Sequence, residues 1–461
     1  MILSYRQAAQ AVVPYFSLRE FGEIAVTEIA RVFTIIALFF CTILVSVGAL
    51  ADDWPQWRGP NRDGVWNETG LIDEFPGPQI EPRWRVPISS GYSGPTVAAG
   101  RVYVTDRVRE PNDSERVLCF DFETGRKLWA HEYECPYAKV SYPAGPRAAV
   151  TIDDGRAFAL GTKGHLHCLD AASGRVLWKK TPDVDYSVRV PIWGIASAPL
   201  VEGELLIVQI GAVGGACIVA LDKTSGKEVW RALDDKVSYS APIVIEQAGR
   251  RVLVCWTGEH VAGLDPASGT VYWKYPFEPN KMVINVPTPV VDGDHLFVTA
   301  FYDGALMLRL LEREPWVERM WRRQGRSERN TDALHCMIST PYMEGRYVYG
   351  VDSYGELRCL DVLTGDRIWE DRTATPEARW SNIHMVRNGD RMWMFNERGE
   401  LIIATLSPQG FHEISRAKLI EPTTEQLRSR GGVCWSHPAY ANRHVIARND
   451  REMVCASLAA E

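Results

Sequence analysis

Short stretches in which apolar and polar residues alternate recur along most of the chain. Segments 197–211 (SAPLVEGELLIVQIG) and 288–304 (TPVVDGDHLFVTAFYDG) each contain two such stretches, separated by Glu-Gly or Asp-Gly. Alternation with a period of two predicts half-buried β-strands, and these dipeptides favour tight hairpin turns. The chain is therefore expected to consist of antiparallel β-hairpins.

A second pattern follows the hairpins and ends in tryptophan. It consists of a small residue, any residue, Asp, three residues, Gly, three residues and Trp. Asp at the start of a turn can accept backbone N–H bonds and Gly supplies a left-handed conformation, so the pattern predicts a turn and an outer strand. Degenerate copies end at Trp321 and Ile414. The five full copies are CFDFETGRKLW (119–129), CLDAASGRVLW (168–178), ALDKTSGKEVW (220–230), GLDPASGTVYW (263–273) and CLDVLTGDRIW (359–369).

The spacing of these copies predicts the fold class. Successive copies lie 43 to 52 residues apart, which is enough for four short strands. The last copy stops near Leu458, before an outer strand could form, and segment 83–88 can supply the missing strand. We therefore predict an all-β, eight-bladed β-propeller of four-stranded blades, closed by pairing of the N-terminal strand with the last blade. The eight inner strands are expected to start near Pro95, Arg147, Pro199, Pro242, Pro289, Pro341, Ile383 and Pro438.

The tryptophans that end the repeats are predicted to have a structural docking role. The residue two before each Asp is Cys, Ala or Gly, and this small side chain would leave room for an indole from the adjacent blade. Burial of an indole removes a large apolar area from water. The predicted docking residues are Trp84, Trp129, Trp178, Trp230, Trp273, Trp321 and Trp369.

The first part of the chain has a different pattern. Residues 32–51 (VFTIIALFFCTILVSVGALA) are apolar and uncharged, and Ala49-Leu50-Ala51 resembles a small-x-small cleavage site. Residues 1–51 are therefore predicted to be a leader with an export signal, and residues 52–461 a single propeller domain. The alternative is an uncleaved anchor, because 20 apolar residues can just span a bilayer. Either way, we expect an exported protein of the periplasm or cell envelope.

Charge and cysteine content exclude several classes. The net charge is −7 without a basic tract, so no nucleic-acid partner is expected. Nine cysteines follow Ala51 and no CxxC occurs, which argues against a disulfide framework and favours cysteines as compact apolar fillers. There is no G-x-S-x-G, Walker loop or H-E-x-x-H. We predict a monomer.

The repeat resembles the pyrroloquinoline-quinone (PQQ) repeat of quinoprotein dehydrogenases and of BamB, the outer-membrane assembly lipoprotein. The opening DDWPQWRGPNRDGVW (52–66), with EPRW (81–84) and GYSGPTV (91–97), resembles a narrower group of BamB-like exported proteins of planctomycete type. The resemblance implies either an envelope protein with a protein partner or a PQQ-dependent oxidoreductase. Active dehydrogenases hold Ca²⁺ beside the quinone, and many have adjacent cysteines. This chain has no Cys-Cys pair and no CxxCH haem motif.

The segments that enter the inner strands are rich in aromatic and polar residues. In a propeller these segments converge on one end of the central channel, so they predict a mouth suited to a planar, sugar-like or peptide ligand. The alternative is that the rings plug the channel and pack the blade tops. The candidate ligand-binding residues are Tyr92, Tyr142, Arg147, Trp193, Tyr239, Asn285, His335, Trp380, His384, Trp435 and His437.

Three features of this set have more than one interpretation. Arg147 could bind an anion or form a plain salt bridge. His335, His384 and His437 could bind a metal if they converge, but they lie in neighbouring blades with no standard ligand spacing, so structural roles are favoured and no metal is assigned. The acidic pairs Asp153-Asp154 and Asp234-Asp235 are interpreted as solvated turns.

Together these patterns predict a non-catalytic binding or scaffold propeller of the cell envelope. It would present its channel mouth or blade edges to a protein partner, and no catalytic residue is assigned. The alternatives are a binder of a small ligand or glycan and a PQQ-dependent oxidoreductase. No cofactor is expected for a binding or scaffold propeller, whereas a PQQ-dependent oxidoreductase would need PQQ and calcium.

Overall fold

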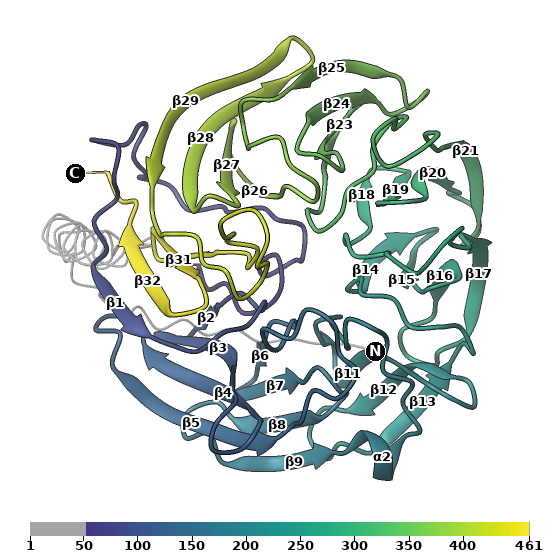
Figure 1. Ribbon diagram of the computed structural model, residues 1–461. Helices are drawn as coiled ribbons and strands as arrows, with labels where there is room; N and C mark the ends of the chain where they lie inside the picture. The colour runs from purple at the N-terminus through teal and green to yellow at the C-terminus, as the bar shows by residue number, and fades with distance from the viewer. Residues whose placement is uncertain (1–51, 461) are drawn as a thin grey trace, which may run out of the picture. The chain divides into compact units, whose positions relative to one another are not determined.

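The computed structural model describes residues 52–460. The predicted leader, with its apolar segment 32–51, lies outside the described residues. Within residues 52–460 no helix has the length and apolarity needed to cross a bilayer. These residues form eight separate four-stranded antiparallel sheets, arranged as the blades of a ring (Figure 1). The predicted eight-bladed, all-β propeller is therefore confirmed.

The first four blades follow one another along the chain, each running from its innermost to its outermost strand. A single helical turn, α2 (Pro182–Asp185), follows the second blade. Blade 1 contains β2 (Thr96–Ala98), β3 (Arg101–Val108), β4 (Ser114–Asp121) and β5 (Lys127–Glu134); blade 2 contains β6 (Thr151–Asp153), β7 (Arg156–Leu160), β8 (Leu166–Asp170) and β9 (Val176–Lys180); blade 3 contains β10 (Leu200–Glu202), β11 (Leu205–Ala212), β12 (Ala216–Asp222) and β13 (Glu228–Ala232); blade 4 contains β14 (Ile243–Gln247), β15 (Arg250–Trp256), β16 (His260–Leu264) and β17 (Val271–Pro276).

The remaining blades repeat this order up to the closing sheet. Blade 5 contains β18 (Val290–Asp292), β19 (His295–Ala300), β20 (Gly304–Leu310) and β21 (Val317–Arg323); blade 6 contains β22 (Tyr342–Glu344), β23 (Tyr347–Val351), β24 (Leu357–Asp361) and β25 (Arg367–Asp371); blade 7 contains β26 (Ile383–Asn388), β27 (Arg391–Asn396), β28 (Glu400–Ser407) and β29 (Gly410–Lys418); blade 8 contains β30 (Ala439–Ala441), β31 (His444–Arg448), β32 (Glu452–Ser457) and, from the start of the described chain, β1 (Trp84–Pro87).

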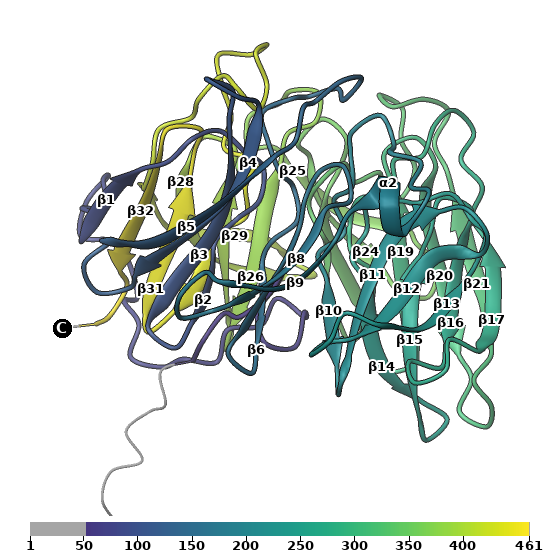
Figure 2. The ribbon, with the colours of Figure 1, turned by 90° about the horizontal axis from the view of Figure 1, so that it is seen from below.

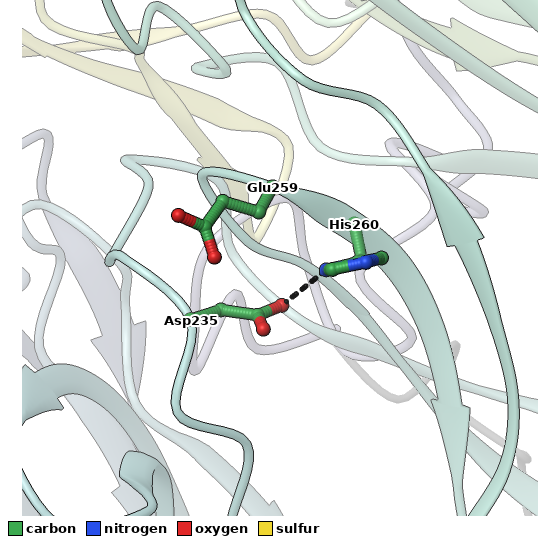
Figure 3. Close-up of side chains that lie close together, drawn as sticks. All are labelled: Asp235, Glu259 and His260. Carbon is green, nitrogen blue, oxygen red and sulfur yellow. Dashed lines mark hydrogen bonds and ion pairs between the residues drawn. The ribbon is translucent and has the colours of Figure 1, made fainter.

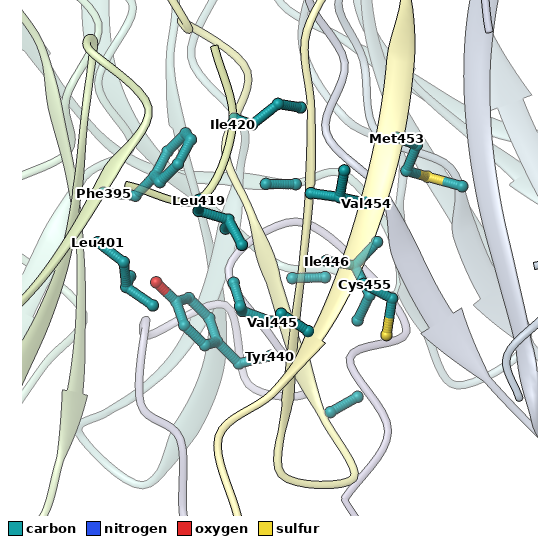
Figure 4. Packing of buried hydrophobic residues seen from close by; sticks show 14 of the residues in the cluster. Phe395, Leu401, Leu419, Ile420, Tyr440, Val445, Ile446, Met453, Val454 and Cys455 are labelled. Carbon is teal, nitrogen blue, oxygen red and sulfur yellow. The ribbon is translucent and has the colours of Figure 1, made fainter. Parts of the chain in front are cut away.

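The two ends of the described chain close the ring in one sheet. Strand β1 pairs antiparallel with β32, with Trp84 opposite Cys455. The closing blade is buried against blade 7, where Tyr440 and Val445 lie on the side of Phe395 and Leu401 (Figure 4). The predicted pairing of the N-terminal strand with the last blade is confirmed. Because the sheet that closes the ring needs both ends, opening it would expose the edge of β32.

Each repeat tryptophan contacts its own blade and the next one. Trp129 lies opposite Cys119 and Trp230 lies opposite Ala220, both within one blade. This corrects the prediction that the small residue accommodates an indole of the adjacent blade, because cross-strand neighbours already fill that space. A glycine of the Asp-x-x-x-Gly turn in the next blade makes the interblade contact of five of the tryptophans, namely Trp84, Trp129, Trp178, Trp230 and Trp321.

The glycine contact is close enough to exclude a side chain. A Cβ on Gly174 would lie 2.6 Å from the ring of Trp129, and one on Gly269 would lie 2.6 Å from Trp230. The indole N–H groups also donate across the blade boundary. The pairs are Trp84 to the Phe122 carbonyl, Trp129 to Ala171, Trp178 to Lys223, Trp230 to Pro266, Trp321 to Val362 and Trp369 to Ser407.

Trp273 differs from the other repeat tryptophans. Its Nε1 donates to Oε1 of Gln247, 3.2 Å away and in the same blade. The next blade carries a degenerate copy of the repeat, whose β20–β21 connection (311–316, LEREPW) lacks the Asp-x-x-x-Gly turn. The interblade acceptor is therefore replaced by a side chain.

All nine cysteines between residues 52 and 460 are free and buried. Cys119, Cys168 and Cys359 each lie opposite the tryptophan of their own repeat. Burial raises the pKa of the Cys359 thiol to about 11 and that of Cys168 to about 12, which keeps both thiols protonated. Their interpretation as compact apolar fillers is confirmed.

The segment before β1 crosses one end of the channel, along the lower side of Figure 2. Trp54 pairs with Val97 of blade 1. The guanidinium of Arg62 donates to the carbonyls of Ala198, Pro199 and Pro242 in blades 3 and 4. Burial lowers the pKa of Arg62 to about 9, but the group stays charged at neutral pH. This segment therefore ties blades on different sides of the ring together.

Candidate functional site

An open cavity lies on the axis of the ring, where the segments preceding the inner strands converge. The volume accessible to water-sized groups is about 150 Å³. The whole empty space between the lining atoms is about 990 Å³, part of which is open solvent. Nine of the eleven predicted residues line it. They are Tyr92, Tyr142, Arg147, Trp193, Tyr239, Trp380, His384, Trp435 and His437.

The other two predicted residues lie elsewhere, because their side chains are occupied by backbone groups. The side-chain amide of Asn285, fully buried, donates to the Thr257 carbonyl at 2.7 Å. The ring of His335 lies 2.9 Å from the Phe301 carbonyl through Nδ1 and 3.0 Å from the Gly325 backbone nitrogen through Nε2. Neither residue lines the axial cavity.

Sequence reasoning missed half of the lining. Small and apolar residues at the start of an inner strand carry no signal that separates a cavity wall from ordinary core. Trp57 reaches the cavity from the N-terminal segment. Its Nε1 donates to the Thr288 hydroxyl at 2.7 Å, and its ring lies edge-on to the ring of His437 with their centroids 4.4 Å apart. Its position depends on a tertiary contact that no local pattern records. The missed lining residues are Trp57, Ala149, Ala196, Ala198, Ala241, Val286, Thr288, Met337 and Ile338.

The aromatic residues form a continuous arc around the cavity. The ring centroids of Tyr239 and Trp193 are 5.2 Å apart, those of Trp193 and Tyr142 are 5.9 Å apart, and those of Tyr142 and Trp380 are 6.1 Å apart. The last two pairs meet edge to face, an arrangement that aromatic quadrupoles favour. The wall is therefore rigid and mostly apolar, with ring faces and edges turned to the cavity.

Arg147 is the one lining residue with a permanent charge in the part of the chain that is described. Its Nη2 donates to the carbonyls of Ser141 and Tyr142, at 3.1 and 2.6 Å, and its Nη1 donates to the Gly145 carbonyl. Its guanidinium carbon lies 4.9 Å from the ring centroid of Tyr92. No carboxylate of residues 52–460 forms an ion pair with Arg147. Of the two interpretations of Arg147, the salt bridge is therefore excluded and anion binding is left.

Two buried histidines form the inner end of the cavity. The rings of His384 and His437 have centroids 6.0 Å apart. Burial lowers the pKa of His384 to about 4, and burial with the neighbouring His384 and Arg58 lowers the pKa of His437 well below its usual value. Both are neutral at pH 7. Since His335 binds backbone groups in another part of the fold, the structure does not bring the three histidines together.

A second polar cluster lies in blade 4, away from the axial cavity (Figure 3). Nδ1 of His260 and a carboxylate oxygen of Asp235 are 2.9 Å apart, and Glu259 completes a group whose ligand-type atoms lie within 4.8 Å. Lys274 contacts Asp235 at 3.4 Å and Lys236 contacts Glu259 at 3.4 Å. The carboxylates therefore already have cationic partners.

This cluster corrects the interpretation of Asp234-Asp235 as a solvated turn. Asp235 is 8% exposed, and its carboxylate accepts a hydrogen bond from the Thr257 hydroxyl at 2.7 Å. Although burial acts in the other direction, hydrogen bonds from Thr257 and His260 hold the pKa of Asp235 below its usual value. In the other acidic pair, Asp153-Asp154, the carboxylate of Asp153 forms an ion pair with Lys223 at 2.9 Å.

The repeats, the blade register and the axial cavity define a PQQ-repeat β-propeller. The sequence profile of the family described as outer membrane protein assembly factor BamB matches residues 79–151, 113–370 and 216–410. Together these matches cover residues 79–410, well over half of the chain. The chain therefore belongs to this family.

The matched relatives include assembly factors and a quinone-dependent dehydrogenase. BamB of Burkholderia pseudomallei is 25% identical over 46% of this chain and 52% of its own length. A 1-butanol dehydrogenase (quinone) of Thauera butanivorans is 29% identical over 30% of this chain and 24% of its own length. The solved quinohemoprotein alcohol dehydrogenase of Comamonas testosteroni has a TM-score of 0.62 at 12% identity, covering 89% of this chain and 81% of its own. At that identity the structural likeness shows the fold alone.

The axial cavity does not fit the cofactor of the dehydrogenase branch. PQQ is a fused three-ring tricarboxylate, and the resemblance implies a Ca²⁺ bound by carboxylate and amide oxygens beside it. Among the described lining residues there is no carboxylate and no side-chain amide, and the volume is close to that of a cavity that holds one benzene ring.

Proposed function

We propose that this protein is a non-catalytic binding propeller of the cell envelope, which holds a protein partner at the mouth of its axial cavity. The observation that carries the proposal is the aromatic arc from Tyr239 to Trp380 around a solvent-open cavity. Aromatic side chains around a concave site are common anchors of protein–protein interfaces. The family name, outer membrane protein assembly factor, supports a role in binding.

The rigid floor of the cavity supports the same proposal. The N-terminal segment fixes Trp57 against Thr288 and His437, so the cavity is closed from below by side chains that are themselves anchored. A preformed pocket loses little conformational entropy when a partner side chain enters it. The segment preceding β1 therefore supports the site as well as the ring.

A binding experiment with matched tryptophan variants tests this proposal. Protein partners cross-linked in envelope extract should be recovered by the wild-type chain and lost with Trp193→Ala, which removes a ring from the arc. Trp316→Ala is the control, because Trp316 is 50% exposed outside the cavity. Equal recovery by all three proteins would refute a mouth site.

The relatives that act as quinone-dependent dehydrogenases make oxidoreductase activity the second candidate. Purified protein incubated with PQQ and Ca²⁺ should give no stoichiometric chromophore and no dye reduction with alcohols, given the lining described above. A bound chromophore with turnover would overturn the non-catalytic assignment. A small glycan is the remaining alternative, and a thermal-shift response to a glycan panel would favour it.

A further inference from the structure

The chemistry of the cavity wall narrows the group that can enter it. We infer that the axial cavity selects a single aromatic ring that carries a negative charge, in the form of an aromatic carboxylate. This inference rests on the proposed binding function and adds the ligand class to it. It follows from the size of the cavity, its ring geometry and its charge.

Size limits the ligand to about one ring. A cavity of roughly 150 Å³ lined by apolar side chains binds benzene, and the space available here has the same volume. The apolar wall includes Ala149, Ala198 and Ala241, which leave room between the larger rings. A six-membered ring fits this space, and any larger part of a ligand would have to lie in the solvent-open mouth.

Two residues of the arc have backbone conformations that bulky residues rarely adopt. Tyr142 has φ 53° and Trp380 has φ 70°, both in the left-handed region. An L-residue in this region costs about 1–2 kcal/mol. Strain of this kind concentrates at ligand sites, where the surrounding structure maintains it. Here it places two rings edge to face across the mouth.

Charge decides between a cationic and an anionic ring. Aromatic walls alone would favour a cation, as in cages for quaternary ammonium groups. Arg147 reverses this preference, because its guanidinium lines the cavity without a carboxylate partner among the described residues. The nearby carboxylate of Glu397 is already held by Arg430 through two bonds of 3.0 Å. The field in the cavity is therefore positive.

Fluorescence titration of the purified full-length protein tests the inference. Benzoate is expected to bind about ten-fold more tightly than benzyl alcohol, and benzylammonium is expected not to bind. Arg147→Gln should remove the preference for benzoate while benzyl alcohol still binds. Trp380→Ala, which removes a ring from the arc, should weaken benzoate and benzyl alcohol alike, each several-fold. Arg319→Gln, at an exposed position on β21, is the control.

The source of the carboxylate is distinguished by two further probes. N-acetyl-L-phenylalanine mimics a C-terminal aromatic residue. N-acetyl-L-phenylalaninamide, in which the carboxylate is replaced by a carboxamide, is its neutral counterpart. Tighter binding of N-acetyl-L-phenylalanine than of benzoate would assign the site to a chain terminus, and the reverse order would assign it to a free aromatic acid. In either case the acid must bind better than its neutral counterpart.

Three outcomes would overturn the inference. Equal binding of benzoate and benzyl alcohol would show that the cavity takes rings without reading charge, and the proposed function would stand. Preferential binding of benzylammonium would invert the assigned charge. Binding of none of the rings, with partner recovery still dependent on Trp193, would leave a protein-binding mouth without an aromatic-acid site.

Discussion

The packing of each indole on the next blade can be measured with one pair of glycine substitutions. Gly269 (φ +72°) and Gly249 (φ +68°) have nearly the same backbone conformation, so alanine costs each about the same strain, roughly 1 kcal/mol. The difference is in their surroundings. A Cβ on Gly269 would lie 2.6 Å from Cε3 of Trp230, whereas a Cβ on Gly249 meets nothing within 4 Å.

The clash sets the magnitude of the expected effect. Overpacking typically adds about 1–3 kcal/mol, so Gly269→Ala should lower the free energy of unfolding by about 2–4 kcal/mol and Gly249→Ala by about 1 kcal/mol. Urea unfolding followed by circular dichroism at pH 7 gives both values. The double variant Trp230→Ala/Gly269→Ala should lose less than the sum of its two single variants, because removing the indole removes the clash.

Two results would refute this reasoning. Equal destabilisation by Gly269→Ala and Gly249→Ala would show that the turn glycine does not contact the indole. Strict additivity in the double variant would show that the two residues act independently. Trp230→Ala alone should cost about 3–5 kcal/mol, since it leaves a core cavity and an unpaired Pro266 carbonyl.

Two further predictions concern buried charge. Because the folded-state pKa of His384 is lowered to about 4, the unfolded chain binds a proton near pH 6.5 that the folded chain does not, so the contribution of His384 to stability should be full above pH 6.5 and fall by up to about 1.4 kcal/mol per pH unit between pH 6.5 and 4. His437 and His167 also have lowered pKa values, so urea midpoints of the wild type and of His384→Gln are compared across this range, and parallel profiles would contradict the prediction. Arg430→Met should destabilise by about 3–5 kcal/mol, because it leaves the fully buried Glu397 without its cation. Arg319→Met is the matched control on an exposed position, and similar midpoints for the two variants would count against the buried pair.

The fold was predictable because its signals are local and repeated. Alternation, turn dipeptides and the Asp-x-x-x-Gly-x-x-x-Trp frame each act within about fifteen residues, and five of the eight blades carry the full frame. The partner of each indole was not predictable in the same way. Each repeat contains both a small residue and a turn glycine, and either could be the neighbour of an indole. Only the structure shows that Trp129 lies opposite Cys119 of its own blade and packs on Gly174 of the next.

The candidate site was predictable to the extent that topology fixes it. Residues that precede inner strands must approach the axis, so Tyr142, Trp193 and Trp435 could be placed from the sequence. The direction in which each side chain points could not be predicted from the sequence. His335 precedes an inner strand as they do, but its ring turns to backbone groups near Phe301. Trp57 reaches the cavity only because the N-terminal segment crosses the channel.

Site-specific photo-cross-linking from the axial cavity tests the central claim most directly. A photoreactive phenylalanine analogue at position 142, on the aromatic arc, and the same analogue at position 316, outside the cavity, would be compared in intact cell envelopes. We expect a discrete partner adduct from position 142 that aromatic competitors reduce, and none from position 316. Adducts from position 316 alone would place the binding surface away from the cavity and contradict the account.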